Sequence, residues 1–211
     1  MKYEIEGKLY DVVVQKKNNK NTYLRVKDDL TIQITTNYFT SRRSVVKLLN
    51  EYHDDLVKMI AIKRKARERE ENFYYLGQKY DIIIVSTIDK VTFDEHFVFT
   101  PSPEKLEKWL KKQVRTLFQE RLDLWYPQFE ERIPYPKLKI RKMKTRWGVC
   151  NKRDDSVTLN FNLIKYDLSA LDYVIVHELS HFIHFDHSQY FWDTVQKYYP
   201  EYKTVTKMLK E

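Results

Sequence analysis

Four of the six histidines in this 211-residue chain lie close together, at positions 177, 181, 184 and 187. They follow the apolar run Val174-Ile175-Val176, and the whole stretch reads VIVHELSHFIHFDH. Residues four apart on an α-helix differ by about 40° in direction and about 6 Å along the axis, so His177 and His181 face one side. The stretch therefore predicts a helix that packs on its apolar face and presents two imidazoles on another.

Two imidazoles at this spacing can bind one metal ion, at about 2.0–2.1 Å for each zinc–nitrogen bond. His184 lies about 10 Å of axial rise beyond His177, so it could join them only after the helix had ended. His187 lies six residues beyond His181, and Asp186 tolerates the irregular backbone of a returning turn. We therefore expect Zn²⁺ to be bound by His177, His181 and His187, with a fourth position open for water.

Glu178 neighbours the first of these ligands on the same helix. Its carboxylate can reach a zinc-bound water without binding the zinc itself. Zinc lowers the pKa of such a water to near 7, and a carboxylate can take the proton and pass it to a leaving amine. This H-E-x-x-H arrangement predicts a zinc-dependent metallopeptidase with Glu178 as the catalytic base.

Other ligand sets remain open. Asp193 or Glu201 could replace His187 as the third ligand, which would keep the peptidase chemistry and change one residue. Cys150, the single cysteine, could instead complete a shell of four protein ligands, as in structural zinc sites. Zinc would then brace a non-catalytic module.

Turn signals divide the chain into a β-rich first half and a mixed second half, with a boundary near residue 100. Short β-rich runs occupy residues 9–14, 23–26 and 30–34, and one helix follows from about Ser41. Further strands are predicted over residues 73–76, 80–87 and 91–99. These patterns predict an α+β fold with a β-rich N-terminal region, 1–100, that contains one helix.

The second half begins with a helix signal at Ser102-Pro103-Glu104, which combines a cap, a proline in the first turn and an acid. Ser169 and Asp172, three residues apart, predict the start of the helix that carries the histidines. Two further helices are expected over residues 190–199 and 202–209, separated by Pro200.

Positive charge is concentrated in one segment. The net charge is +8, and residues 136–153 contain eight basic residues and no acidic ones. Lys137, Lys139 and Arg141 alternate with Leu138 and Ile140, so this strand has one packed face and one charged face. It predicts a basic edge strand, which could place the protein near nucleic acid by holding a phosphate backbone. An ordinary solvated surface is the simpler interpretation.

No apolar run reaches the length of a membrane span, and the N-terminus lacks the apolar core of a signal peptide. The single cysteine cannot form an internal disulfide, which suits a reducing compartment. The chain is 42% hydrophobic and 15% aromatic, as is typical of a folded globular protein. We therefore expect a cytoplasmic protein with no membrane partner.

Several short motifs occur in a fixed order along the second half. They are Arg146-Trp147-Gly148-Val149-Cys150, Leu159-Asn160, the block 171–181, Asp186-His187-Ser188 and Phe191-Trp192. This series resembles the YgjP-like metallopeptidases, relatives of the SprT-like zincins, whose pattern is close to R-W-G-S-C, L-N, D-Y-V-I-V-H-E-L-x-H, N-H-S and F-W. Val149 and Asp186 depart from that pattern.

The resemblance implies three histidine ligands at 177, 181 and 187 and a catalytic glutamate at 178. It also implies a zincin-like metallopeptidase domain over residues 101–211, with an edge strand that pairs with a protein or peptide substrate. Arg146 and Trp147 could then bind substrate, Arg146 by polarising the scissile carbonyl. Alternatively, Trp147 packs under the active-site helix and Arg146 is ordinary surface.

A metal-dependent endoribonuclease is the main alternative enzyme. Bacterial endoribonucleases that process ribosomal RNA carry the same H-x3-H-x5-H ligand spacing, and a basic strand would suit RNA phosphates. That family has Gly after the first histidine, whereas this chain has Glu178. A non-catalytic, zinc-braced module associated with nucleic acid is the third interpretation.

Overall fold

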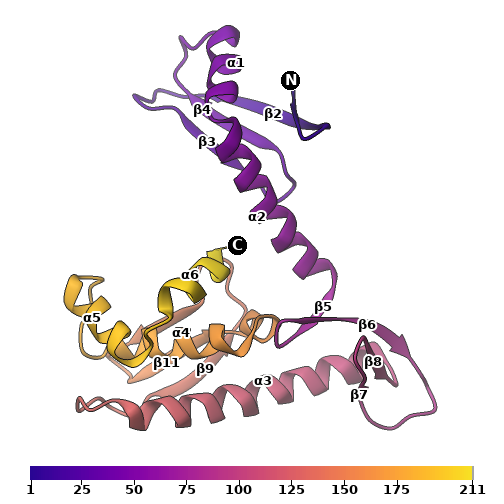
Figure 1. The fold of residues 1–211 in the computed structure, drawn as a ribbon, viewed down its shortest axis with the longest axis vertical. Coiled ribbons are helices and arrows are strands. Elements are labelled where there is room, and N and C mark those ends of the chain that lie inside the picture. The colour runs from indigo at the N-terminus through magenta and orange to yellow at the C-terminus, as the bar shows by residue number, and fades with distance from the viewer. Residues whose placement is uncertain (211) are drawn as a thin grey trace. The chain divides into compact units, whose positions relative to one another are not determined.

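The computed structural model describes residues 1–210. They form an α+β fold with two compact units, which comprise residues 1–71 and 72–210 (Figure 1). Each unit has its own hydrophobic core. Among the described residues, no helix combines the length and the apolar character that crossing a bilayer requires.

Unit 1 contains a mixed four-stranded sheet in the order β1-β2-β4-β3. Its strands are β1 (Lys2–Ile5), β2 (Lys8–Lys16), β3 (Tyr23–Val26) and β4 (Ile32–Thr36). β2 and β4 run parallel, and the other pairs are antiparallel. Alternate residues such as Val12, Ile32 and Ile34 are buried in the same core as residues of the two following helices, because side chains of a strand alternate between its faces.

The single helix expected after Ser41 is two helices, α1 (Arg42–Glu51) and α2 (His53–Glu71). Ser41 is the N-cap, and its side chain accepts a hydrogen bond from the Ser44 amide. Tyr52 separates the two helices because its φ and ψ angles, −101° and 25°, lie outside the helical range. The interruption is slight, since the Tyr52 amide still donates to the Leu48 carbonyl.

Unit 2 begins with a small sheet in the order β5-β6-β8-β7. Its strands are β5 (Phe73–Tyr75), β6 (Gln78–Ile84), β7 (Thr92–Phe93) and β8 (Phe97–Thr100). The long helix α3 (Pro103–Trp125) follows, capped by Ser102 and with proline in its first turn as predicted. Trp109 of α3 packs against Tyr75 and Phe93, at ring-centroid distances of 5.2 and 5.1 Å.

These ring contacts explain why the small sheet belongs to the same compact unit as α3. The predicted boundary near residue 100 lies inside unit 2, between β8 and α3. The strands end and a helix begins at that point, but the aromatic contacts through Trp109 join the small sheet to α3. The division into a β-rich N-terminal region, 1–100, and a metallopeptidase domain, 101–211, stays a prediction.

A second sheet of unit 2 has the order β10-β11-β9. The strands are β9 (Lys137–Arg141), β10 (Gly148–Asn151) and β11 (Ser156–Asn160). β9 runs parallel to the central strand β11, and β10 runs antiparallel to it. The basic strand β9 is therefore an edge strand, as predicted, and β10 forms the opposite edge.

Helix α4 (Leu168–Ser180) is the centre of unit 2, and ten of its thirteen residues are buried. It begins after Asp167, whose side chain accepts from the Ser169 amide, so the predicted cap at Ser169 lies two residues too late. Helices α5 (Gln189–Tyr198) and α6 (Tyr202–Lys210) follow it (Figure 1). Two short 3₁₀ helices, η1 (Tyr126–Gln128) and η2 (Phe161–Lys165), precede it.

Candidate metal centre

The three predicted ligands lie together at the C-terminal end of α4. One side-chain nitrogen from each of His177, His181 and His187 lies within 4.8 Å of the other two. The Nε2 atoms of His177 and His187 are 3.2 Å apart. The chain reverses between His181 and His187, as the sequence predicted, and brings the third imidazole to the first two.

The fourth histidine of the cluster has a different position. His184 stacks on Tyr190, with ring centroids 6.1 Å apart, and its ring is not in the group of possible ligands among the described residues. Its backbone carbonyl lies 3.2 Å from Nδ1 of His181. His184 therefore contributes a main-chain oxygen that can orient a neighbouring imidazole.

Both helix-borne histidines have a partner at the ring nitrogen Nδ1. His177 Nδ1 lies 3.4 Å from the Tyr173 hydroxyl, and His181 Nδ1 faces the carbonyl just described. Contacts of this kind fix the tautomer and leave Nε2 as the metal-binding atom. The sequence analysis did not identify Tyr173, although its position four residues before His177 is a usable signal.

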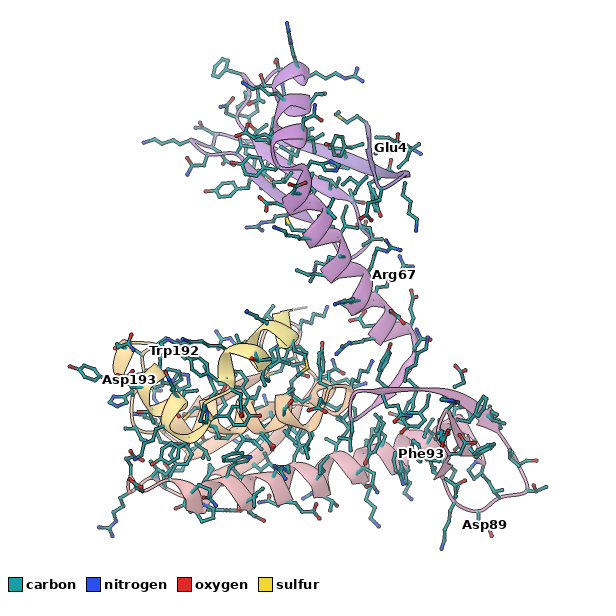
Figure 2. The ribbon with its side chains drawn as sticks, viewed as in Figure 1. Glu4, Arg67, Asp89, Phe93, Trp192 and Asp193 are labelled. Carbon is teal, nitrogen blue, oxygen red and sulfur yellow. The ribbon has the colours of Figure 1, made fainter. Side chains whose placement is uncertain are left out.

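The Phe191 ring packs against all three imidazoles. Its ring centroid lies 4.9 Å from that of His177, 4.5 Å from that of His181 and 4.8 Å from that of His187. Phe191 is fully buried, and Trp192 stacks on His187 at 5.8 Å. Trp192 and its neighbour Asp193 lie on α5 (Figure 2). The packing holds the three rings in fixed positions.

Burial also sets the charge of the imidazoles. Burial, together with smaller effects of the neighbouring His181 and His187, lowers the pKa of His177 to about 3. Burial lowers the pKa of His181 as well, although the carbonyl of His184 opposes this effect. Both rings are therefore neutral at pH 7, which is the form of histidine that binds metal ions.

Glu178 is buried beside this cluster, with 4% of its surface exposed. Burial raises the pKa of its carboxyl to about 8, while the Cys150 amide and the Arg146 guanidinium act in the opposite direction. Glu178 and the three histidines line one cleft, with a cavity volume of about 520 Å³. Strand β10, the loop before it and helix α6 supply the rest of the cleft wall.

The Glu178 side chain can occupy this position only because residue 148 is a glycine. A Cβ atom at residue 148 would lie 2.6 Å from Cγ and 2.7 Å from Cδ of Glu178, far closer than van der Waals contact. The chain has only three glycines, and this one is the first residue of strand β10. A glycine in a strand often marks a close approach, so the signal for Gly148 was present in the sequence.

Trp147 has a structural role. Its indole N–H donates to the Leu209 carbonyl of α6 at 3.2 Å, and its ring meets Tyr166 edge-on at 5.0 Å. Arg146 is exposed at the cleft and lies close enough to Glu178 to lower the pKa of that carboxyl. Direct contact of either residue with substrate stays a prediction.

The rival ligands lie elsewhere. The Asp193 carboxylate accepts a hydrogen bond from Gln189, and Glu201 is exposed between α5 and α6. Neither belongs to the group of possible metal ligands within residues 1–210, and neither does Cys150. Burial raises the pKa of the Cys150 thiol to about 12, which disfavours the thiolate that a metal requires.

The basic segment 136–153 does not present all its charges on one surface. Lys139 pairs with Asp154 and donates to Ser156, and Lys142 lies over the ring of Phe161 at 5.4 Å. Arg146 belongs to the cleft. The association of this segment with nucleic acid stays a prediction.

Comparisons with known proteins place the chain in a family. The model of the YgjP-like family, metallopeptidase domain, matches residues 20–211, and no curated protein is similar enough in sequence to count as a relative. One similar solved structure is the metallopeptidase zymogen of Pyrococcus abyssi abylysin, at 24% identity, covering 46% of this chain and 90% of that chain, with a TM-score of 0.36. Another is the metallopeptidase zymogen of Methanocaldococcus jannaschii jannalysin, at 22% identity, covering 46% and 92%, with a TM-score of 0.35. Because its family model spans most of the sequence, this chain belongs to the YgjP-like family of metallopeptidase domains.

Proposed function

We propose that the chain is a zinc-dependent metallopeptidase in which His177, His181 and His187 bind the metal and Glu178 is the general base. The observation that carries this proposal is the convergence of three imidazoles in a cleft that Glu178 also lines. Three histidine nitrogens with an open fourth position form a donor set typical of catalytic zinc. A bound zinc ion supplies a Lewis acid that lowers the pKa of water and polarises a carbonyl.

Glu178 would move the protons of the reaction. A carboxylate whose pKa is raised by burial can take a proton from the attacking water and then release it to the leaving amine. The Cys150 amide holds the carboxylate from the strand side, as its effect on the Glu178 pKa indicates. Arg146 adds a positive charge near the place where negative charge develops on the substrate oxygen.

The open edge of β10 suits an extended peptide. The Asn160 amide donates to the Trp147 carbonyl. Along an antiparallel pair of strands, residues that hydrogen-bond to the partner strand alternate with residues that do not. Val149 and Asn151 therefore bond to β11, while the backbone groups of Gly148 and Cys150 face away from it. The Cys150 amide donates to Glu178, so the Gly148 amide and the carbonyls of Gly148 and Cys150 are the groups that a peptide strand would meet. This arrangement supports substrate binding by strand addition, directly beside Glu178.

Metal analysis and a cleavage assay on one set of variants test the proposal. The purified protein is expected to hold about one zinc, measured by inductively coupled plasma mass spectrometry, and to cleave fluorescein-labelled casein. Glu178→Gln should keep the zinc and lose at least about 100-fold in cleavage rate, because the base is removed. His187→Ala should lose most of the zinc.

Two exposed carboxylates provide matched controls. Asp193→Asn and Glu201→Gln make the same chemical change as Glu178→Gln at the rival ligand positions, and both should keep zinc and activity. Undiminished cleavage by Glu178→Gln would remove Glu178 as the base. Loss of zinc from either control would reassign the third ligand. Cleavage of RNA without cleavage of casein would replace the peptidase by the endoribonuclease.

A further inference from the structure

Basic residues gather at one end of the sheet of unit 1, whereas acidic and basic residues are mixed at the other end. β2 and β4 are parallel, with Lys16 opposite Thr36, so both strands finish at the same end. β3 is antiparallel to β4 and therefore starts there, and the loop 17–22 and the start of α1 lie at this end too. We call this the cationic end; its exposed charged residues are Lys16, Lys17, Lys20, Arg42, Arg43 and Lys47.

Hydrogen bonds fix these segments together. The buried Thr36 hydroxyl lies 2.8 Å from that of Thr22 in the β2–β3 loop and 2.7 Å from that of Thr40 ahead of α1. The Lys17 amide donates to the Thr36 carbonyl at 2.8 Å, and the Lys16 ammonium donates to the Tyr38 carbonyl at 3.1 Å. The cationic end is therefore one ordered surface built from three segments.

The acids of the strands and turns lie at the other end or along the sheet. Asp28 and Asp29 form the turn between β3 and β4, and Glu6 lies in the turn between β1 and β2. Glu4 lies on β1 (Figure 2). Within residues 1–210, none of the six cations at the cationic end forms an ion pair. Their field therefore acts on a partner in solution.

Aromatic rings are exposed among these cations. Phe39 is 96% exposed and Tyr38 60% exposed, in the loop between β4 and α1. Tyr23, at the start of β3, is 48% exposed. Packing within unit 1 gives no reason for a phenyl ring in this position, because almost all of its surface faces water. Asn18 and Asn21 add exposed amides in the neighbouring loop.

We propose that the cationic end of unit 1 binds single-stranded nucleic acid. The cations match a phosphate backbone, and exposed rings provide surfaces on which unpaired bases stack, whatever their sequence. The asparagine amides can donate to and accept from base edges. An anionic membrane is a poorer match, because the same amides would enter an apolar layer without hydrogen-bond partners. This inference does not depend on the proposed peptidase function.

Fluorescence anisotropy of the full chain with labelled 20-nucleotide oligo(dT) and oligo(rU) tests the proposal. About four phosphate contacts predict roughly 50-fold weaker binding on going from 50 to 200 mM NaCl. Phe39→Ala should weaken binding about 10-fold with no change in the salt slope, because it removes stacking and no charge. Its melting temperature should not change, since the ring is exposed.

A pair of double variants separates position from net charge. Arg42→Ser/Arg43→Ser and Lys142→Ser/Lys144→Ser each remove two positive charges, the second pair from the basic segment of unit 2. The first should lower the salt slope by about 1.4, and the second should leave it near the original value. Equal losses in both would overturn the proposal in favour of general charge attraction.

Three other results would also overturn it. One is an unchanged affinity in Phe39→Ala, which would show that no base stacks there. Another is duplex DNA binding as tightly as the single strand. The third is tighter binding to phosphatidylserine vesicles than to either oligonucleotide, with the same sensitivity to Phe39, which would assign the surface to a membrane.

Discussion

Gly148 and Glu178 share a space that holds only one side chain. The Glu178 carbon chain lies where a Cβ of residue 148 would be, and the carboxylate is too buried to move aside freely. The position of the proposed base therefore depends on a residue that has no side chain. Gly148 is in this sense a positioning residue, and its effect should be measurable through Glu178.

A double-mutant cycle measures that effect. Gly148→Ala should destabilise the protein by about 1–3 kcal/mol, as overpacking of a buried site does. In a Glu178→Ala background the same change should cost almost nothing, because the competing atoms have been removed. Thermal unfolding of the four proteins gives the coupling, and Cys150→Ala on the same strand is the control. An undiminished cost in the Glu178→Ala background would separate the two residues.

Activity should respond in parallel. A shift of Glu178 by about 1 Å should lower kcat of Gly148→Ala by roughly 100-fold with little change in KM, since the edge of β10 remains. Steady-state kinetics on a fluorogenic peptide check this split. A rise in KM with an unchanged kcat would place Gly148 in substrate binding instead.

The buried carboxyl of Glu178 predicts a pH effect in the metal-free protein. Burial raises its pKa from 4.5 to about 8, so the folded state holds a proton that the unfolded chain has already lost. The stability that Glu178 contributes is full below pH 4.5 and falls as the pH rises through 8. In EDTA, Glu178→Gln should therefore melt on the order of 10 °C above the wild type at pH 8, and near it at pH 4.5. Equal melting temperatures at both pH values would contradict the burial of an ionisable group.

Helices α3 and α4 are joined by a buried ion pair. Arg121 binds Asp172 through two hydrogen bonds, Nε to Oδ1 and Nη2 to Oδ2, both of 2.6 Å. The Arg121 side chain is 22% exposed and that of Asp172 10%. The sequence analysis treated Asp172 as part of a helix start, because its partner lies 51 residues earlier in the chain. The pair holds α4, and with it His177 and Glu178, against α3.

Removal of one partner should therefore be costly. Arg121→Ala should destabilise unit 2 by about 3–5 kcal/mol, because it leaves a buried carboxylate without a counter-charge. Lys111→Ala, which breaks an exposed pair with Glu107 on the same helix, should cost at most about 0.5 kcal/mol. Urea unfolding of both variants checks the difference. Similar costs would mean that the Arg121 pair is no better shielded from water than the exposed one.

The two units have separate cores, which predicts two thermal transitions in calorimetry. Unit 1 is the smaller, with 71 residues, and buries less of its surface than unit 2, so it should melt first. Zinc at about 100 times its dissociation constant should raise only the transition of unit 2, by about 10 °C, since a ligand stabilises the unit that binds it. The His187→Ala variant should lose this shift. One transition that moves as a whole would show that the units unfold together.

The convergence of His177, His181 and His187 follows from local geometry, which is why it could be predicted. The spacing of His177 and His181 depends only on helical pitch, and the turn back to His187 needs only a few residues. The β-rich start, the cap at Ser102 and the basic edge strand also follow from short-range patterns. Such features depend on residues that are close in the sequence, so they can be predicted from the sequence alone.

The remaining features depend on residues that are distant in the sequence. Gly148 meets Glu178 across 30 positions, and the Trp147 indole reaches the Leu209 carbonyl across 62. The placement of the small sheet on α3 and the gathering of cations at one end of unit 1 depend on strand order and direction. No local pattern encodes which segments meet, because packing selects among many pairings with similar local preferences. The clustering of the three histidines could therefore be predicted from the sequence, whereas the position of the proposed base and both cores required the fold.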